Sequence, residues 1–125
     1  MDSRHSTQEE AFQKIIEDYE SLNNTQVKNF STENGNIIRI DTNSFHKYID
    51  NNDEECFGCY AVNPRGYEYY SNPEDSRYGA SLHTTTVDLP LECEDWDRNE
   101  ILNLMNSKKA KWSGKYTQFY YWTLD

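Results

Sequence analysis

The sequence predicts a single α+β domain: a mostly antiparallel sheet of about five strands with two or three short helices packed on one face. Three observations lead to this fold class. The chain has 125 residues, which suits one domain over residues 1–125 and is too short for two ordinary ones. Its hydrophobic periodicities follow the order α, β, α, β-β-β, α, β, so adjacent strands dominate over strand–helix–strand units. Aromatic residues make up 14% of the chain, a fraction that disordered acidic sequences lack.

The first expected element is an amphipathic helix over residues 8–22. Ser6 and Glu9 form a capping box ahead of it. Apolar side chains then recur at helical spacing, at Ala11, Phe12, Ile15, Ile16, Tyr19 and Leu22. Residues 1–7 are expected to be flexible. Residues 23–35 are polar and predict a loop or an irregular start to the next strand, and residues 36–42 alternate as a strand does.

The middle of the chain predicts one more helix and then a hairpin. Phe45, Tyr48 and Ile49 fit a short helix capped by Thr42 or Asn43, and residues 51–55 form an acidic turn. Residues 56–62 form a strand, residues 63–66 (Asn-Pro-Arg-Gly) give a type I turn signal, and residues 67–71 form the returning strand. A second turn over residues 72–79 leads to a Thr-rich strand at residues 81–89, which Pro90 ends.

The C-terminal part predicts a helix and a last strand. Asp97 and Glu100 form a capping box for a short helix around residues 101–105. Residues 107–114 are basic and predict a flexible connection. Residues 115–124 carry aromatic side chains on both faces, so we expect this strand to be central in the sheet.

The charge is concentrated in one stretch. Within a total of −10, residues 51–97 hold eleven acidic residues against two arginines, a net −9. Such a surface repels nucleic acid and anionic membranes, so we expect neither as a partner. No apolar run approaches the roughly 20 residues that span a bilayer, and the first ten residues lack a signal-peptide core. Three cysteines without an export signal favour reduced thiols and a cytoplasmic location.

Short motifs give little support for an enzyme. The Cys56-Phe57-Gly58-Cys59 string precedes a strand rather than a helix, which disfavours a redox site. A zinc site needs a second close pair, which Cys93, His83 and His46 do not supply. The spacing favours two small side chains on opposite faces of a strand. The acids at 92–97 lack the central glycine of an EF-hand. We therefore expect no metal and no cofactor.

The favoured function is a small acidic binding protein that neutralises a basic protein partner, such as an immunity or antitoxin-type inhibitor of a nuclease toxin. The expected partner-binding residues are Asp53, Glu54, Glu55, Tyr69, Tyr70, Glu92, Glu94, Asp95, Trp96 and Asp97. An alternative is a small α+β enzyme or ligand-binding domain with an aromatic-lined pocket around His83, to which Asp88, the Thr84–Thr86 run and the cysteines would contribute. A third is an adaptor or structural protein whose charge serves only solubility.

Overall fold

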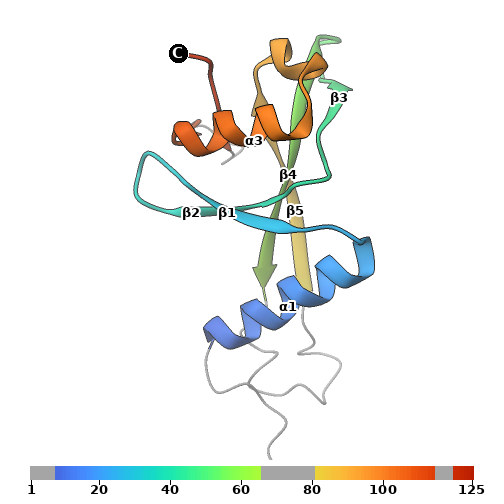
Figure 1. Ribbon diagram of the computed structural model, residues 1–125, viewed down its shortest axis with the longest axis vertical. Coiled ribbons are helices and arrows are strands. Elements are labelled where there is room, and N and C mark those ends of the chain that lie inside the picture. Colours follow the sequence, from blue (N-terminus) through green and yellow to red (C-terminus); the bar gives the residue numbers. More distant parts are fainter. Residues whose placement is uncertain (1–7, 66–80, 115–119) are drawn as a thin grey trace, which may run out of the picture.

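Two long antiparallel strands form the centre of the structure, a computed structural model that describes residues 8–65, 81–114 and 120–125 (Figure 1). These strands are β4 (Glu55–Arg65) and β5 (Ser81–Leu89), paired from Phe57↔Leu89 to Arg65↔Ser81. The remaining elements are α1 (Gln8–Asn23), β1 (Val27–Ser31), β2 (Ile37–Asp41), β3 (His46–Ile49), the 3-10 helix η2 (Leu91–Asp95), α3 (Arg98–Ser107), β6 (Lys111–Trp112) and β7 (Tyr120–Tyr121).

The sheet is mixed and curled. Its order is β1-β2-β4-β5-β7-β6, and β3 lies beside β4 on the same edge as β2. Only the β5–β7 pair is parallel among the described strands. β2 meets β4 at a single register pair, Ile40↔Ala61, and Figure 1 shows β1 and β2 crossing β4 and β5 at a steep angle. A bridge between Thr32 and Ala110 connects the far ends of the order, next to β1 and β6.

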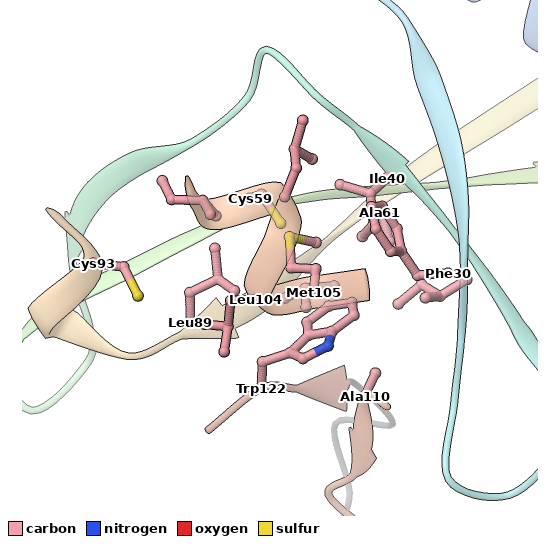
Figure 2. Packing of buried hydrophobic residues seen from close by; sticks show 14 of the residues in the cluster. Phe30, Ile40, Cys59, Ala61, Leu89, Cys93, Leu104, Met105, Ala110 and Trp122 are labelled. Carbon is pink, nitrogen blue, oxygen red and sulfur yellow. The ribbon is translucent and has the colours of Figure 1, made fainter. Parts of the chain in front are cut away.

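The main hydrophobic core lies between α3 and the inner face of this curl (Figure 2). Ile101, Leu102, Leu104 and Met105 of α3 are buried in it. The sheet contributes Phe30, Ile38, Ile40, Phe57, Cys59, Ala61, Val87 and Leu89, and Trp122 joins them from just after β7. The helix begins at Asp97, whose side chain accepts a hydrogen bond from the Glu100 backbone N–H at 2.9 Å, as the capping motif predicts.

The other helix covers the opposite face, which corrects the expectation that the helices pack on one face. Successive side chains of a strand point to opposite faces, so Arg39 and Asp41 face away from the core that holds Ile38 and Ile40. The Arg39 guanidinium lies 6.0 Å from the centroid of the Phe12 ring, and the Tyr19 hydroxyl donates to Asp41 Oδ2 at 2.6 Å. Both partners belong to α1. The strands therefore need cover on two sides.

Several predicted elements are confirmed. The first helix, the strand at residues 36–42, the acidic turn, the strand at residues 81–89 and the helix after Asp97 all occur close to their expected bounds. Two strands lie in segments predicted to be loops or connections, β1 within residues 23–35 and β6 within residues 107–114. The described sheet has seven strands rather than about five.

Two local predictions are wrong. The expected helix at residues 45–49 is strand β3, because it pairs with β4 from His46↔Gly58 to Ile49↔Glu55. The first three residues of the expected turn at residues 63–66 continue β4, in which Pro64 lies opposite Leu82, and Gly66 lies outside the described residues. Proline is tolerated there because β2 leaves the other edge of β4 after Ala61. The returning strand at residues 67–71 and the flexible segment 1–7 lie outside the described residues.

The predicted central strand at residues 115–124 is shorter within the described residues. Its paired part is β7, and residues 115–119 lie outside the described ranges. β7 lies between β5 and β6, so it is an interior strand next to the last strand of the order rather than the middle one. Trp122 after it is 2% exposed.

Candidate functional site

The strand register brings the two acidic segments of the chain to one end of the molecule. The β4–β5 ladder ends at Phe57↔Leu89, so the turn before β4 and η2 after β5 both lie beyond the same end of the ladder (Figure 1). Lys47 of β3 and Glu94 of η2 form an ion pair of 3.7 Å that links the two segments. We call the following residues the acidic end: Asp53, Glu54, Glu55, Glu92, Glu94, Asp95 and Asp97.

The turn directs its carboxylates into solvent. Asp50 Oδ1 accepts hydrogen bonds from the backbone N–H groups of Asn52 and Glu54 at 2.8 and 2.9 Å. These bonds lower the pKa of the Asp50 carboxyl. Asp53 adopts a φ of 60°, a left-handed conformation that closes the turn. The side chains of Asp53, Glu54 and Glu55 are exposed to solvent.

The 3-10 helix η2 carries three of the other acids and is fixed to the core through one buried side chain. Cys93 is 0% exposed and packs in the main core, whereas Glu92, Glu94 and Asp95 are exposed. Trp96 is half-buried against the same core, so part of its ring packs in the core rather than facing solvent. The other expected anchors, Tyr69 and Tyr70, lie outside the described residues. The structure thus assembles all seven acids and Trp96 at one end of the molecule.

A row of aromatic side chains that the sequence did not indicate lies on the sheet face opposite α3. It consists of Tyr48 and His46 of β3 and Tyr60 of β4, which we call the aromatic strip. The ring centroids of His46 and Tyr60 are 4.9 Å apart, and those of His46 and Tyr48 are 5.9 Å apart. Alternation along β3 puts His46 and Tyr48 on one face, and the antiparallel register places Tyr60 beside them. The alternation of His46 and Tyr48 was not recognised in the sequence because the spacing of residues 45–49 also fits a helix.

Both ends of the aromatic strip are close to carboxylates. At one end, the Tyr48 hydroxyl donates to Asp88 Oδ1 on β5. At the other end, the β2–β4 register places Asp41 beside Tyr60, and Asp41 accepts hydrogen bonds from Tyr19 and Thr25. Burial, the hydrogen bond and the charge of Asp88 raise the pKa of Tyr48 above its usual range. Burial and the Asp50 carboxylate likewise raise the pKa of the Cys56 thiol. A raised pKa disfavours the reactive thiolate, so Cys56 does not have the character of a redox cysteine.

The residues of the alternative pocket do not all meet, because they are divided between the two faces of the sheet. His83 is exposed opposite Asn63. It lies an odd number of positions from Asp88 along β5, so the two side chains point to opposite faces. Cys59 and Cys93 are buried in the core, whereas Cys56 lies on the other face, as its spacing from Cys59 predicts.

A groove of about 390 Å³ lies elsewhere, between α1 and the β1–β2 pair. It is lined by Phe12, Gln13, Ile16, Glu20, Val27, Asn29 and Arg39, none of which belongs to the predicted sites.

Within the described ranges, no three His, Cys, Asp or Glu residues are grouped so that they could hold a metal ion. None of the helices in those ranges is long and apolar enough to cross a membrane. No protein-family model matches the chain, and comparisons with curated proteins and with solved structures give no significant match.

Proposed function

We propose that this protein is a small acidic binding protein that neutralises a basic protein partner, most specifically an immunity or antitoxin-type inhibitor of a nuclease toxin in the cytoplasm. The observation that carries the proposal is the assembly of two acidic segments, more than thirty residues apart in the sequence, at one end of the fold. An acidic surface needed only for solubility has no requirement for such a gathering.

The geometry favours electrostatic recognition. The seven carboxylates of the acidic end are exposed, and the structure gives Glu94 a basic partner in Lys47, itself 53% exposed. Clustered exposed charges of one sign raise the rate at which an oppositely charged partner is captured. Asp97 contributes to the field while one of its oxygens caps α3. The half-buried Trp96 gives the charged surface a fixed apolar contact.

A nuclease is the partner class that best fits this chemistry. Proteins that bind nucleic acid carry lysine and arginine clusters that contact phosphates. A cluster of carboxylates with a charge density similar to that of the phosphates competes for those side chains and blocks the nucleic-acid site. The inhibitor then needs no catalytic residue of its own. The enzyme alternative is weaker because His83 and Asp88 lie on opposite faces of β5.

The experiment is a binding measurement with charge-matched variants. The basic protein retained by the immobilised chain from its own cell lysate at low salt is identified, and its association kinetics are measured at two salt concentrations. Glu92→Lys with Glu94→Lys and Asp95→Lys reverses one half of the acidic end. Glu17→Lys with Asp18→Lys and Asp125→Lys changes the net charge equally at exposed positions outside it.

The first triple variant should lower the association rate constant by about tenfold or more and flatten its salt dependence, while the control changes it much less. It should also stop inhibiting a nuclease partner. Circular dichroism verifies that both variants fold. Equal effects of the two variants, or no basic protein retained at all, would show that the charge is only a solubilising surface.

A further inference from the structure

We propose that the aromatic strip is a docking surface for arginine side chains of the basic partner, so that the partner is read by its arginines as well as by its net charge. The inference rests on the proposed function and extends it to a surface that adjoins the acidic end. It begins from the exposure of the strip. His46 and Tyr48 are half-buried and Tyr60 is 38% exposed, so all three rings keep part of their surface accessible.

The position of the rings makes them one surface rather than three isolated side chains. His46 lies opposite Gly58 and Tyr48 opposite Cys56 on β4, and Tyr60 follows two residues after Gly58. From the level of Tyr48 to Tyr60 the strip spans four residues of β4, roughly 13 Å at the usual rise of a strand. The two ring contacts of His46 hold the three side chains together.

The charge around the strip selects a cation. Alternation along β3 puts Lys47 on the other face. Arg39 of β2 lies on the same face as the strip, but its guanidinium packs over the Phe12 ring of α1. Asp88 lies beside the Tyr48 end. Its Oδ1 accepts the tyrosine hydroxyl, and a carboxylate has further acceptor positions for a ligand. The strip also begins beside the turn at residues 50–54, so it is continuous with the acidic end.

The chemistry favours guanidinium over ammonium. An arginine head group is flat and weakly hydrated, stacks on aromatic rings and donates several hydrogen bonds at once, whereas lysine presents a strongly hydrated point charge. His46 adds an acceptor. Its Nδ1 lies 2.6 Å from the Ser44 carbonyl oxygen, which can only accept, so Nδ1 carries the hydrogen. In the neutral ring Nε2 is then an acceptor for an N–H of the ligand.

The test compares two probes, labelled deca-arginine and deca-lysine peptides, at low salt. Wild-type protein should bind the arginine peptide several-fold more tightly, in line with a cation–π preference at a partly exposed site. Tyr60→Leu with His46→Ala should remove this preference while the lysine peptide loses little affinity. Trp112→Leu is the matched control, because Trp112 packs on Tyr120 with ring centroids 4.8 Å apart, on the β6–β7 pair.

The outcomes separate this inference from the proposed function. The triple reversal at the acidic end should weaken both peptides together. If both peptides bind wild type equally, or if the double variant keeps the arginine preference, the strip is not the arginine site even though the acidic end binds cations. If neither peptide binds, both proposals are overturned. Proton NMR of the wild type provides a second measurement without mutation, since the ring signals of His46 should shift on addition of the arginine peptide and not of the lysine peptide.

Discussion

Tyr48 and Asp88 are joined by a hydrogen bond although their strands, β3 and β5, are not neighbours. The tyrosine crosses the intervening strand β4 at Gly58, the residue paired with Asp88. A Cβ atom at position 58 would lie 3.4 Å from Tyr48 Cε1 and 2.5 Å from the Val87 carbonyl oxygen. The glycine therefore provides the space in which one aromatic side chain connects three strands.

The first prediction is that Gly58→Ala destabilises the fold. The added methyl group meets a backbone oxygen that cannot rotate away, and overpacking of this kind costs about 1–3 kcal/mol. Urea unfolding measures the change. The control is Gly35→Asn. An added Cβ there meets nothing within 4 Å, and asparagine keeps the backbone strain at a φ of 83° small, so this substitution should cost less than Gly58→Ala. A Gly58→Ala protein as stable as wild type would show that β4 and β5 can separate at this point without loss.

A second prediction concerns alkaline pH. Burial, followed by hydrogen bonds to Asp41 and Asp88, raises the pKa of Tyr19 and of Tyr48 above the usual range. In the unfolded chain both hydroxyls lose their proton near pH 10. The folded state then binds more protons than the unfolded state. The contribution of these two groups to the free energy of unfolding should therefore be constant below about pH 10 and decrease as the pH rises above it.

Urea midpoints between pH 8 and pH 11 test this dependence. Tyr19→Phe with Tyr48→Phe removes the two hydroxyls, so its stability should decline less steeply than that of wild type above pH 10. The double variant is also expected to be less stable at pH 8, because two hydrogen bonds are lost. Parallel declines for the two proteins above pH 10 would assign the alkaline loss to other groups.

A third prediction concerns Asp41, the last residue of β2 before the turn that leads to β3. Asp41 is 6% exposed, and its carboxylate accepts hydrogen bonds from Tyr19, Thr25 and the Asn43 backbone N–H. Asp41→Asn replaces one acceptor oxygen by a donor in a site where the surrounding groups are donors. The expected cost is about 2–3 kcal/mol, since hydrogen bonds to a charged group are the strong ones.

Asp53→Asn is the matched control for that change. Asp53 is exposed, and its φ of 60° suits asparagine at least as well as aspartate. Its urea midpoint should stay close to that of wild type. Equal losses for the two substitutions would mean that the hydrogen bonds of Asp41 contribute no more than the charge of an exposed carboxylate.

Elements with local signals could be predicted from the sequence. The strand at residues 81–89 ends before Pro90, which has no backbone N–H to donate to the ladder. Asp97 begins α3 by accepting a hydrogen bond from the backbone three residues along the chain. The error at residues 45–49 has a physical reason. Phe45, Tyr48 and Ile49 suit a helix by spacing, while His46 and Tyr48 suit a strand by alternation, and pairing with β4 decides between them.

The candidate site could be predicted only in part for the same reason. The composition identifies the acids at residues 53–55 and 92–97, but only the β4–β5 register brings them to one end. The aromatic strip was missed because its residues belong to two strands whose pairing no local pattern indicates. Long-range pairing is a property of the whole chain, and side-chain spacing within one segment does not contain it.

The last prediction concerns Trp122, which lies in the main core after the short strand β7 (Figure 2). It is 2% exposed, its ring meets Phe30 edge to face with centroids 5.9 Å apart, and its Nε1 donates to the Lys108 carbonyl oxygen at 3.2 Å. Trp122→Ala should lower the free energy of unfolding by about 3–5 kcal/mol, the usual cost of removing a buried tryptophan. Leu124→Ala, at a side chain 42% exposed, should change it little.

Truncation after Gly114 removes the same tryptophan together with β7 and should abolish cooperative unfolding in a thermal melt followed by circular dichroism. A truncated chain that still unfolds cooperatively would show that α3 and the remaining strands suffice for the core.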